Sequence, residues 1–267
     1  MIEEREPTEK ELRLGSQISA AVEQYARKHS AALILFHAKD HVDVGSATCV
    51  TIEGHFFLAT AAHNFGGNIP RESIRVVAPH STSEDWLPIA RIGFVDSCHP
   101  DVGYLELEPS VAQRSGLEFL SLESLGLFEK PGPNSLYLAE GIPAALTTRK
   151  QPTISLTSLG YMTIPAETEA VKHEYSPEME LLLEYTGAQY PLPPPNGMSG
   201  GGIWRVPNEL QPMVWTPESS KLVAIVRSWW PQSNHLAAVR IEYWLQLMSR
   251  HYPDITEEIE ALLSGDT

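Results

Sequence analysis

The segment Pro195-Asn-Gly-Met-Ser-Gly-Gly-Gly-Ile-Trp204 places one serine among four glycines, between a proline-rich stretch and an apolar one. Glycine loses the most backbone freedom on ordering, so this composition is unfavourable inside a strand or a helix. It suits a backbone that turns sharply and brings N–H groups close to a ligand. An acyl-transfer enzyme needs such donors around its nucleophile, directed at the developing oxyanion. Ser199 is therefore a candidate nucleophile, with a simple glycine-rich turn as the alternative.

Two upstream segments supply a candidate base and a candidate acid. The apolar run Phe56-Phe-Leu-Ala-Thr-Ala-Ala-His63 ends on a histidine, and His99-Pro-Asp-Val-Gly-Tyr-Leu-Glu-Leu107 carries Asp101 before an alternating, strand-like stretch. A lone histidine is more often structural, and an aspartate after proline often caps a turn. The order histidine, aspartate, serine is, however, that of the Ser-His-Asp triad in two-barrel hydrolases. Three motifs in this order favour catalysis.

These motifs resemble those of trypsin-like (chymotrypsin-fold) serine proteases. Thr60-Ala-Ala-His63 is similar to the family's histidine motif, Asp101-Val-Gly-Tyr-Leu to its aspartate motif, and Gly197-Met-Ser-Gly-Gly-Gly202 to its serine motif. A weaker match, Leu222-Val-Ala-Ile-Val-Arg-Ser-Trp-Trp230, resembles the strand that lines the substrate cleft. The resemblance covers roughly residues 31 to 250. It implies a serine endopeptidase with catalytic His63, Asp101 and Ser199 and with no cofactor or metal. The oxyanion hole is expected at the N–H groups of Gly197 and Ser199, with that of Met198 as a weaker candidate.

A Gly-x-Ser-x-Gly pattern at residues 197–201 also fits the nucleophile elbow of α/β-hydrolases. That fold needs an acid and then a histidine after the serine. Downstream of Ser199 the histidines are His235 and His251, and the aspartates Asp254 and Asp266 follow both of them. The order is wrong, so this interpretation is rejected.

The strand-like runs predict a mostly β protein of two packed six-stranded antiparallel β-barrels with N- and C-terminal helices. A helical extension is expected over 1–30, with an apolar stripe of Leu12, Ile18, Ala21, Val22 and Tyr25. The first barrel, 31–120, would carry His63 and Asp101 on strands at 31–37, 46–52, 55–59, 74–77, 89–95 and 103–107. The second, 121–241, would carry Ser199, with strands at 135–139, 152–156, 160–164, 180–185, 201–206 and 221–228. A further strand is expected at 236–241, followed by a helical segment over 242–267.

The net charge, the cysteines and the hydropathy limit where the protein is expected to be located and which partners it is expected to bind. A net charge of −15 argues against nucleic-acid binding. The sequence shows no secretory signal and no apolar run of about 18 residues that would span a membrane. Secreted relatives usually carry a cysteine directly after the catalytic histidine, where this chain has Asn64. Cys49 and Cys98 are therefore expected to be reduced, and the protein cytoplasmic. The expected partners are a protein or peptide substrate and, as an option, a regulatory protein.

The resemblance also makes expectations about substrate binding, at Pro193, Asn196, Arg227, Ser228 and Trp229. Pro193 occupies the place where trypsin-like relatives keep an acid at the base of the primary pocket. We therefore expect a small or apolar residue, rather than lysine or arginine, before the cut. Arg227 would attract an acidic substrate side chain or simply point to solvent, and the tryptophan would form an apolar floor or merely pack.

The sequence leaves open how the enzyme would be regulated and whether it is active at all. Secreted relatives carry an aspartate before the serine that binds a newly cleaved N-terminus, but this chain has Met198, and a thioether cannot pair with an ammonium group. The enzyme would then be constitutively formed or switched by a partner. The competing class is a non-catalytic, protease-like binding module, and an esterase activity on the same site is a third option.

Overall fold

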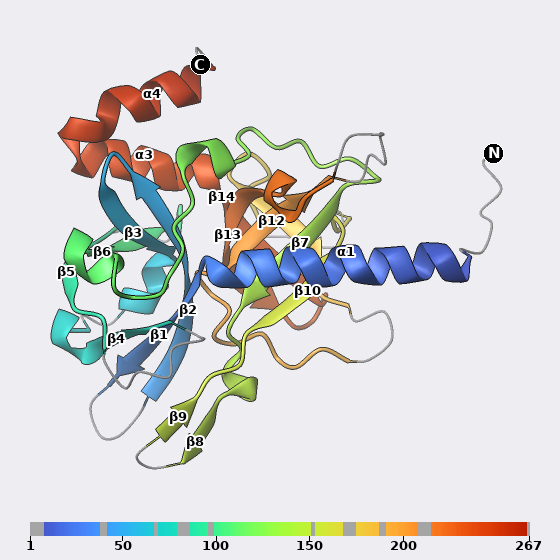
Figure 1. The fold of residues 1–267 in the computed structure, drawn as a ribbon, viewed down its shortest axis with the longest axis horizontal. Helices are drawn as coiled ribbons and strands as arrows, with labels where there is room; N and C mark the ends of the chain where they lie inside the picture. Colours follow the sequence, from blue (N-terminus) through green and yellow to red (C-terminus); the bar gives the residue numbers. More distant parts are fainter. Residues whose placement is uncertain are drawn as a thin grey trace.

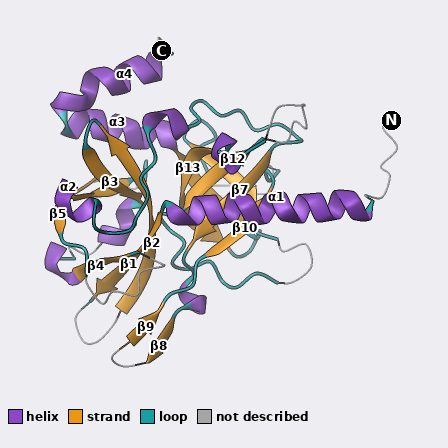
Figure 2. Cartoon of the chain, in the orientation of Figure 1, coloured by secondary structure: helices purple, strands orange, loops and turns teal. Residues whose placement is uncertain are grey.

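The computed structural model describes residues 8–37, 42–66, 69–78, 86–95, 99–150, 153–167, 175–186, 191–207 and 215–265. Across these residues the chain forms two curled six-stranded antiparallel sheets, each a half-barrel, with helices at both ends (Figure 1). Figure 2 shows the two sheets in orange and the terminal helices in purple. The predicted mostly β, double-barrel architecture is confirmed.

The first sheet has the strand order β4-β1-β2-β3-β6-β5. Its strands are β1 (Ser30–Phe36), β2 (Val42–Ile52), β3 (His55–Thr60), β4 (Ile74–Val77), β5 (Ile89–Phe94) and β6 (Gly103–Leu107). β2 begins at Val42 rather than at the predicted residue 46, because its first residues pair with the end of β1 in the register Phe36↔Val42. The other strands lie where the apolar alternation predicts them.

The second sheet has the order β10-β7-β12-β13-β14-β11. Its strands are β7 (Leu136–Gly141), β10 (Leu159–Thr163), β11 (Glu180–Glu184), β12 (Gly202–Val206), β13 (Lys221–Trp230) and β14 (His235–Arg240). The prediction of a barrel strand at 152–156 is wrong: β9 (Thr153–Ser155) pairs with β8 (Thr148–Lys150) in a separate two-stranded sheet. β14 takes the place in the barrel, because its apolar run 236–239 is almost fully buried, whereas β9 has a single apolar residue to bury.

The predicted N-terminal helix is α1 (Glu9–Lys28), which lies across the second sheet with its first turns beyond the body of the protein (Figure 1). Val22 and Ala26 are fully buried against β7, β10 and β12. Leu12 was expected in the apolar stripe but is 58% exposed, because α1 reaches the barrel only from about Ile18 onward.

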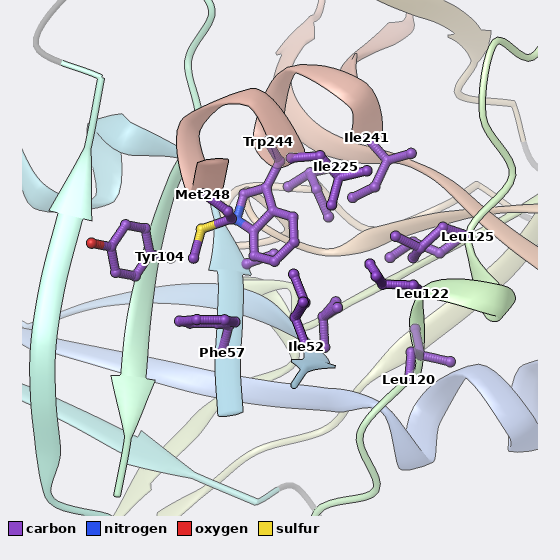
Figure 3. Close-up of a cluster of buried hydrophobic side chains, with 14 of the residues drawn as sticks. Ile52, Phe57, Tyr104, Leu120, Leu122, Leu125, Ile225, Ile241, Trp244 and Met248 are labelled. Atoms are coloured by element: carbon purple, nitrogen blue, oxygen red, sulfur yellow. The ribbon is translucent and has the colours of Figure 1, made fainter. Parts of the chain in front are cut away.

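The largest apolar cluster fills the seam between the two sheets and the C-terminal helix α3 (Ile241–His251) (Figure 3). Trp244 of α3 is fully buried there, and its indole N–H donates to the carbonyl oxygen of Gly103 at 3.2 Å. The helix is thereby fixed to the strand that follows Asp101. Both barrels and the segment between them contribute to the cluster, including Ile52, Phe57, Tyr104, Leu120, Leu122, Leu125 and Ile225.

A polar network attaches the C-terminal segment to the outer side of the first sheet. His55 of β3 lies between two carboxylates, with Nδ1 2.8 Å from Glu106 Oε1 and Nε2 2.9 Å from Asp254 Oδ2. Asp254 belongs to the 3-10 helix η7 (Pro253–Ile255), between α3 and α4 (Thr256–Ser264). Burial opposes ionisation of His55, but the hydrogen bonds with Glu106 and Asp254 outweigh it and raise the pKa of the imidazole.

Replacing His55 by asparagine should therefore lower the free energy of unfolding in a pH-dependent way. A raised folded-state pKa gives stabilisation that is complete below the unfolded value of about 6.5 and is lost as the pH rises through the folded value. Urea unfolding of wild type and His55→Asn should show a clear difference near pH ~6 and a smaller one near pH ~9. Asp254→Asn should weaken the same pH dependence. A difference between wild type and His55→Asn that stays constant with pH would contradict this assignment.

Cys49 is a free, buried cysteine, and burial raises the pKa of its thiol. Cys98 lies outside the described residues. Among the described helices, none combines the length and the apolar character needed to cross a membrane.

Candidate active site

His63 and Asp101 lie together at the end of the first sheet. His63 is in the 3-10 helix η1 (Ala62–Phe65), directly after β3, and Asp101 precedes β6, the strand paired with β3. His63 Nδ1 is 2.6 Å from Asp101 Oδ2, and the backbone N–H of His63 donates to Asp101 Oδ1 at 2.9 Å. A carboxylate only accepts, so the Nδ1 atom carries the proton. This leaves Nε2 free of a proton in the neutral ring, which is what a general base requires.

Ser199 lies in residues 195–201, called here the nucleophile loop, directly before β12. Gly197 and Gly200 have φ values of +96° and +94°, a region that favours glycine. A Cβ atom at Gly200 would lie 1.9 Å from the carbonyl oxygen of Ser46, and one at Gly197 would lie 2.7 Å from that of Ile142. Both glycines are therefore required by conformation and by space.

The hydroxyl of Ser199 donates to the carbonyl oxygen of Arg227 at 3.1 Å. Within the described residues, it makes no hydrogen bond with His63 Nε2. Both side chains nevertheless line the same cavity. Catalytic hydrogen bonds are often loose or misaligned without substrate, and a rotation about the Cα–Cβ bond of Ser199 reorients the hydroxyl.

The N–H groups of the nucleophile loop have two different uses. The amide of Met198 donates to the carbonyl oxygen of Pro195, and the amide of Gly200 to that of Val226, both at 2.8 Å. Within the described part of the chain, the amides of Gly197 and Ser199 donate no backbone hydrogen bond. These two groups remain for an anionic ligand, whereas the amide of Met198 does not. Met198 itself is fully buried in an apolar cluster.

A cavity of about 510 Å³ opens beside the histidine and the serine. Beyond His63 and Ser199, both apolar and polar residues line it. The apolar ones include Val42 and Val44 of β2, Ile154 of β9, and Ile69, and the others include Asp43, Asn196 and Gly197. The predicted substrate-binding residues Pro193, Arg227, Ser228 and Trp229 do not belong to its described lining.

These residues form a separate region, called here the wall, which adjoins Ser199 through the carbonyl oxygen of Arg227. Arg227 is 9% exposed, and its Nε lies 3.0 Å from Oε1 of the fully buried Glu180. The guanidinium therefore neither points to solvent nor presents an uncompensated charge. The hydroxyl of Tyr185 donates to the carbonyl oxygen of Pro193 at 2.5 Å, and the Tyr185 ring packs 6.2 Å from that of Trp229. The wall is largely apolar.

Sequence reasoning missed several polar residues that contact the nucleophile loop. Ser46 of β2 donates its hydroxyl to the carbonyl oxygen of Gly197, and Asn64 donates its carboxamide N–H to that of Ser199. The available signal was weak: a small polar residue in an otherwise apolar strand and a carboxamide directly after the histidine. No group of three or more metal-ligating side chains occurs in the described residues.

No family model and no curated protein matches the sequence. Solved structures do match. The serine endoprotease from Yersinia pestis has a TM-score of 0.56 at 13% identity, over 94% of this chain and 69% of that one. A thermostable serine protease from an extremophilic microorganism has a TM-score of 0.54 at 13% identity, over 80% of this chain and 91% of that one. At this identity the similarity shows the fold alone. The chain has the two-barrel fold of trypsin-like serine proteases.

Proposed function

We propose that the protein is a serine endopeptidase that cleaves peptide bonds through an acyl-enzyme. The observation that carries the proposal is the paired contact of His63 with Asp101, beside a cavity that both His63 and Ser199 line. Two further features support it: the positive φ of Gly197 and the two loop amides that donate no backbone hydrogen bond.

In this mechanism Ser199 Oγ leaves its hydrogen bond with Arg227, turns to His63 and attacks the scissile carbonyl. His63 Nε2 takes the hydroxyl proton and then delivers it to the leaving amine. Asp101 stabilises the imidazolium and holds the ring through its contact with Nδ1. The amides of Gly197 and Ser199 bind the oxyanion. Water then repeats the sequence on the acyl-enzyme and restores the serine.

The substrate preference follows from the wall beside Ser199. Arg227 is already paired with Glu180, so its charge offers an acidic substrate side chain little attraction. Pro193 and Trp229, which are half-buried and contact the buried Tyr185, present apolar surface in the same region. We therefore propose a small or apolar residue before the cut, and a substrate that is a protein or peptide.

Cleavage mapping tests the proposal and the preference together. The protein is incubated with an unfolded protein mixture, and new N-termini are identified by mass spectrometry. We expect cuts that follow small or apolar residues, because Glu180, the acid inside the wall, is buried and already paired with Arg227. A profile dominated by lysine or arginine would contradict the preference, and the absence of cuts would contradict the activity.

The second candidate is a protease-like module that is inactive alone and either binds partners or waits for one. The hydrogen bond from Ser199 to Arg227, instead of to His63, favours it. The two candidates differ in reactivity toward a fluorophosphonate probe, which requires an assembled serine and base. A module inactive alone would remain unlabelled.

A further inference from the structure

The carbonyl groups of the nucleophile loop are held from the opposite barrel. Ser46, on β2 of the first sheet, donates its hydroxyl to the carbonyl oxygen of Gly197 at 2.8 Å. The same hydroxyl accepts the backbone N–H of Ile142, also at 2.8 Å. In addition, the backbone N–H of Ser46 donates to the carbonyl oxygen of Ser199 at 2.9 Å. Ser46 is fully buried, so water cannot replace these bonds.

Asn64, the residue after His63, also contacts the nucleophile loop. Its Nδ2 atom donates to the carbonyl oxygen of Ser199 at 3.0 Å and to Thr60 Oγ1 at 2.8 Å. Thr60 Oγ1 in turn donates to the carbonyl oxygen of Ser46 at 2.8 Å. A Cβ atom on Gly45 would lie 3.0–3.1 Å from the carboxamide of Asn64, so the carboxamide packs closely over that glycine. Ser46, Thr60 and Asn64 thus form one connected, buried set of hydrogen bonds, called here the brace.

The brace bears on the oxyanion hole through the planarity of the peptide bond. Because the peptide is planar and trans, the carbonyl of one residue and the N–H of the next point in opposite directions. The N–H group of Gly197 shares a peptide plane with the carbonyl of Asn196, which accepts a hydrogen bond from the N–H of Ala144 at 2.6 Å. The N–H group of Ser199 shares a plane with the carbonyl of Met198, which accepts one from the N–H of Gly201 at 2.8 Å. The two planes that follow them are those whose carbonyls the brace holds.

We propose that Ser46 and Asn64 are positioning residues that keep the amides of Gly197 and Ser199 directed at the oxyanion. They act through the backbone, take no part in proton transfer and touch no substrate carbonyl. Without these side-chain bonds, the peptide planes on the C-terminal side of each amide keep only their backbone hydrogen bonds, such as those from Met198 to Pro195 and from Gly200 to Val226. They are then held less firmly, and the two donors converge less well. This inference rests on the proposed function, because an oxyanion hole matters only if Ser199 attacks a carbonyl.

The test uses Ser46→Ala and Asn64→Leu, with Thr51→Val as the matched control. Thr51 also lies on β2 and donates a hydroxyl to a backbone carbonyl, that of His55, away from the loop. The two brace variants should lower kcat on the order of tenfold to a hundredfold, below the roughly 10²–10³ that loss of an oxyanion-hole donor itself costs. KM and the midpoints of the pH profile should stay close to wild type, and Thr51→Val should change neither kcat nor KM appreciably.

Amide hydrogen exchange measured by mass spectrometry gives a readout independent of activity. Exchange across residues 195–201 should be faster in both brace variants than in wild type, while Thr51→Val leaves it unchanged. Ser46→Ala deletes a single oxygen atom and carries the test if Asn64→Leu does not fold. Unchanged exchange in Ser46→Ala would overturn the brace, even if the wild type proves to cleave nothing and the proposed function fails. Faster exchange with an unchanged kcat, or a loss confined to KM, would overturn the positioning role.

Discussion

Replacing Ser199 by alanine should abolish labelling by a fluorophosphonate probe and reduce peptide cleavage on the order of 10⁶-fold in kcat. The reason is that Ser199 supplies the oxygen that attacks the scissile carbonyl in the proposed mechanism. The carbonyls and amides of the nucleophile loop remain in place in the variant, because within the described residues the hydroxyl hydrogen-bonds only to the carbonyl oxygen of Arg227. The fold should therefore be unaffected, and circular dichroism and urea unfolding should match wild type.

Ser121→Ala is a suitable control, since Ser121 is an exposed serine next to a short 3-10 helix. It should label and cleave as wild type does. His63→Ala should be about as severe as Ser199→Ala, because a serine without its base is a weak nucleophile. Equal labelling of wild type and Ser199→Ala would mean that another residue reacts with the probe, and the assignment of the nucleophile would be wrong.

The sequence predicted the double barrel well because its main signals are local. Alternation and apolar runs mark strands such as β4 and β6, and the terminal helices follow the 3.6-residue period. The incorrect strand at 152–156 shows the limit of local signals. A short segment flanked by a proline can form a hairpin strand or a barrel strand, and the choice depends on which segment buries more apolar surface in the complete sheet.

Contacts between residues distant in the chain escaped prediction. The charge of Arg227 was expected at the cleft or in solvent, yet Glu180 of β11 compensates it inside the wall. Ser46 and Asn64 gave almost no signal, since a serine in a strand usually needs no special explanation. Their role depends on two barrels meeting at a seam, and composition alone does not specify which strand faces the nucleophile loop.

Asp101→Asn should lower kcat by roughly 10⁴-fold while leaving the fold intact. The two oxygens of Asp101 accept from two different donors of His63, the backbone N–H at 2.9 Å and the ring at 2.6 Å. The backbone donor cannot change, so asparagine must keep its carbonyl oxygen on the backbone N–H. Its NH₂ group then faces Nδ1, which must become an acceptor. The proton of the neutral ring is thereby forced onto Nε2, the atom that has to receive the proton of Ser199.

The tautomer itself provides the decisive measurement for this variant. Nitrogen NMR of the labelled imidazole should show the proton on Nδ1 in wild type and on Nε2 in Asp101→Asn, with unfolding in urea unchanged. Asp254→Asn removes a carboxylate of η7 that does not contact His63, and it should keep both the wild-type tautomer and wild-type kcat. Full activity of Asp101→Asn with the proton on Nε2 would exclude His63 as the base. A large loss of stability in Asp101→Asn would instead contradict the expectation of an intact fold, and the loss of kcat would then not be assignable to the tautomer.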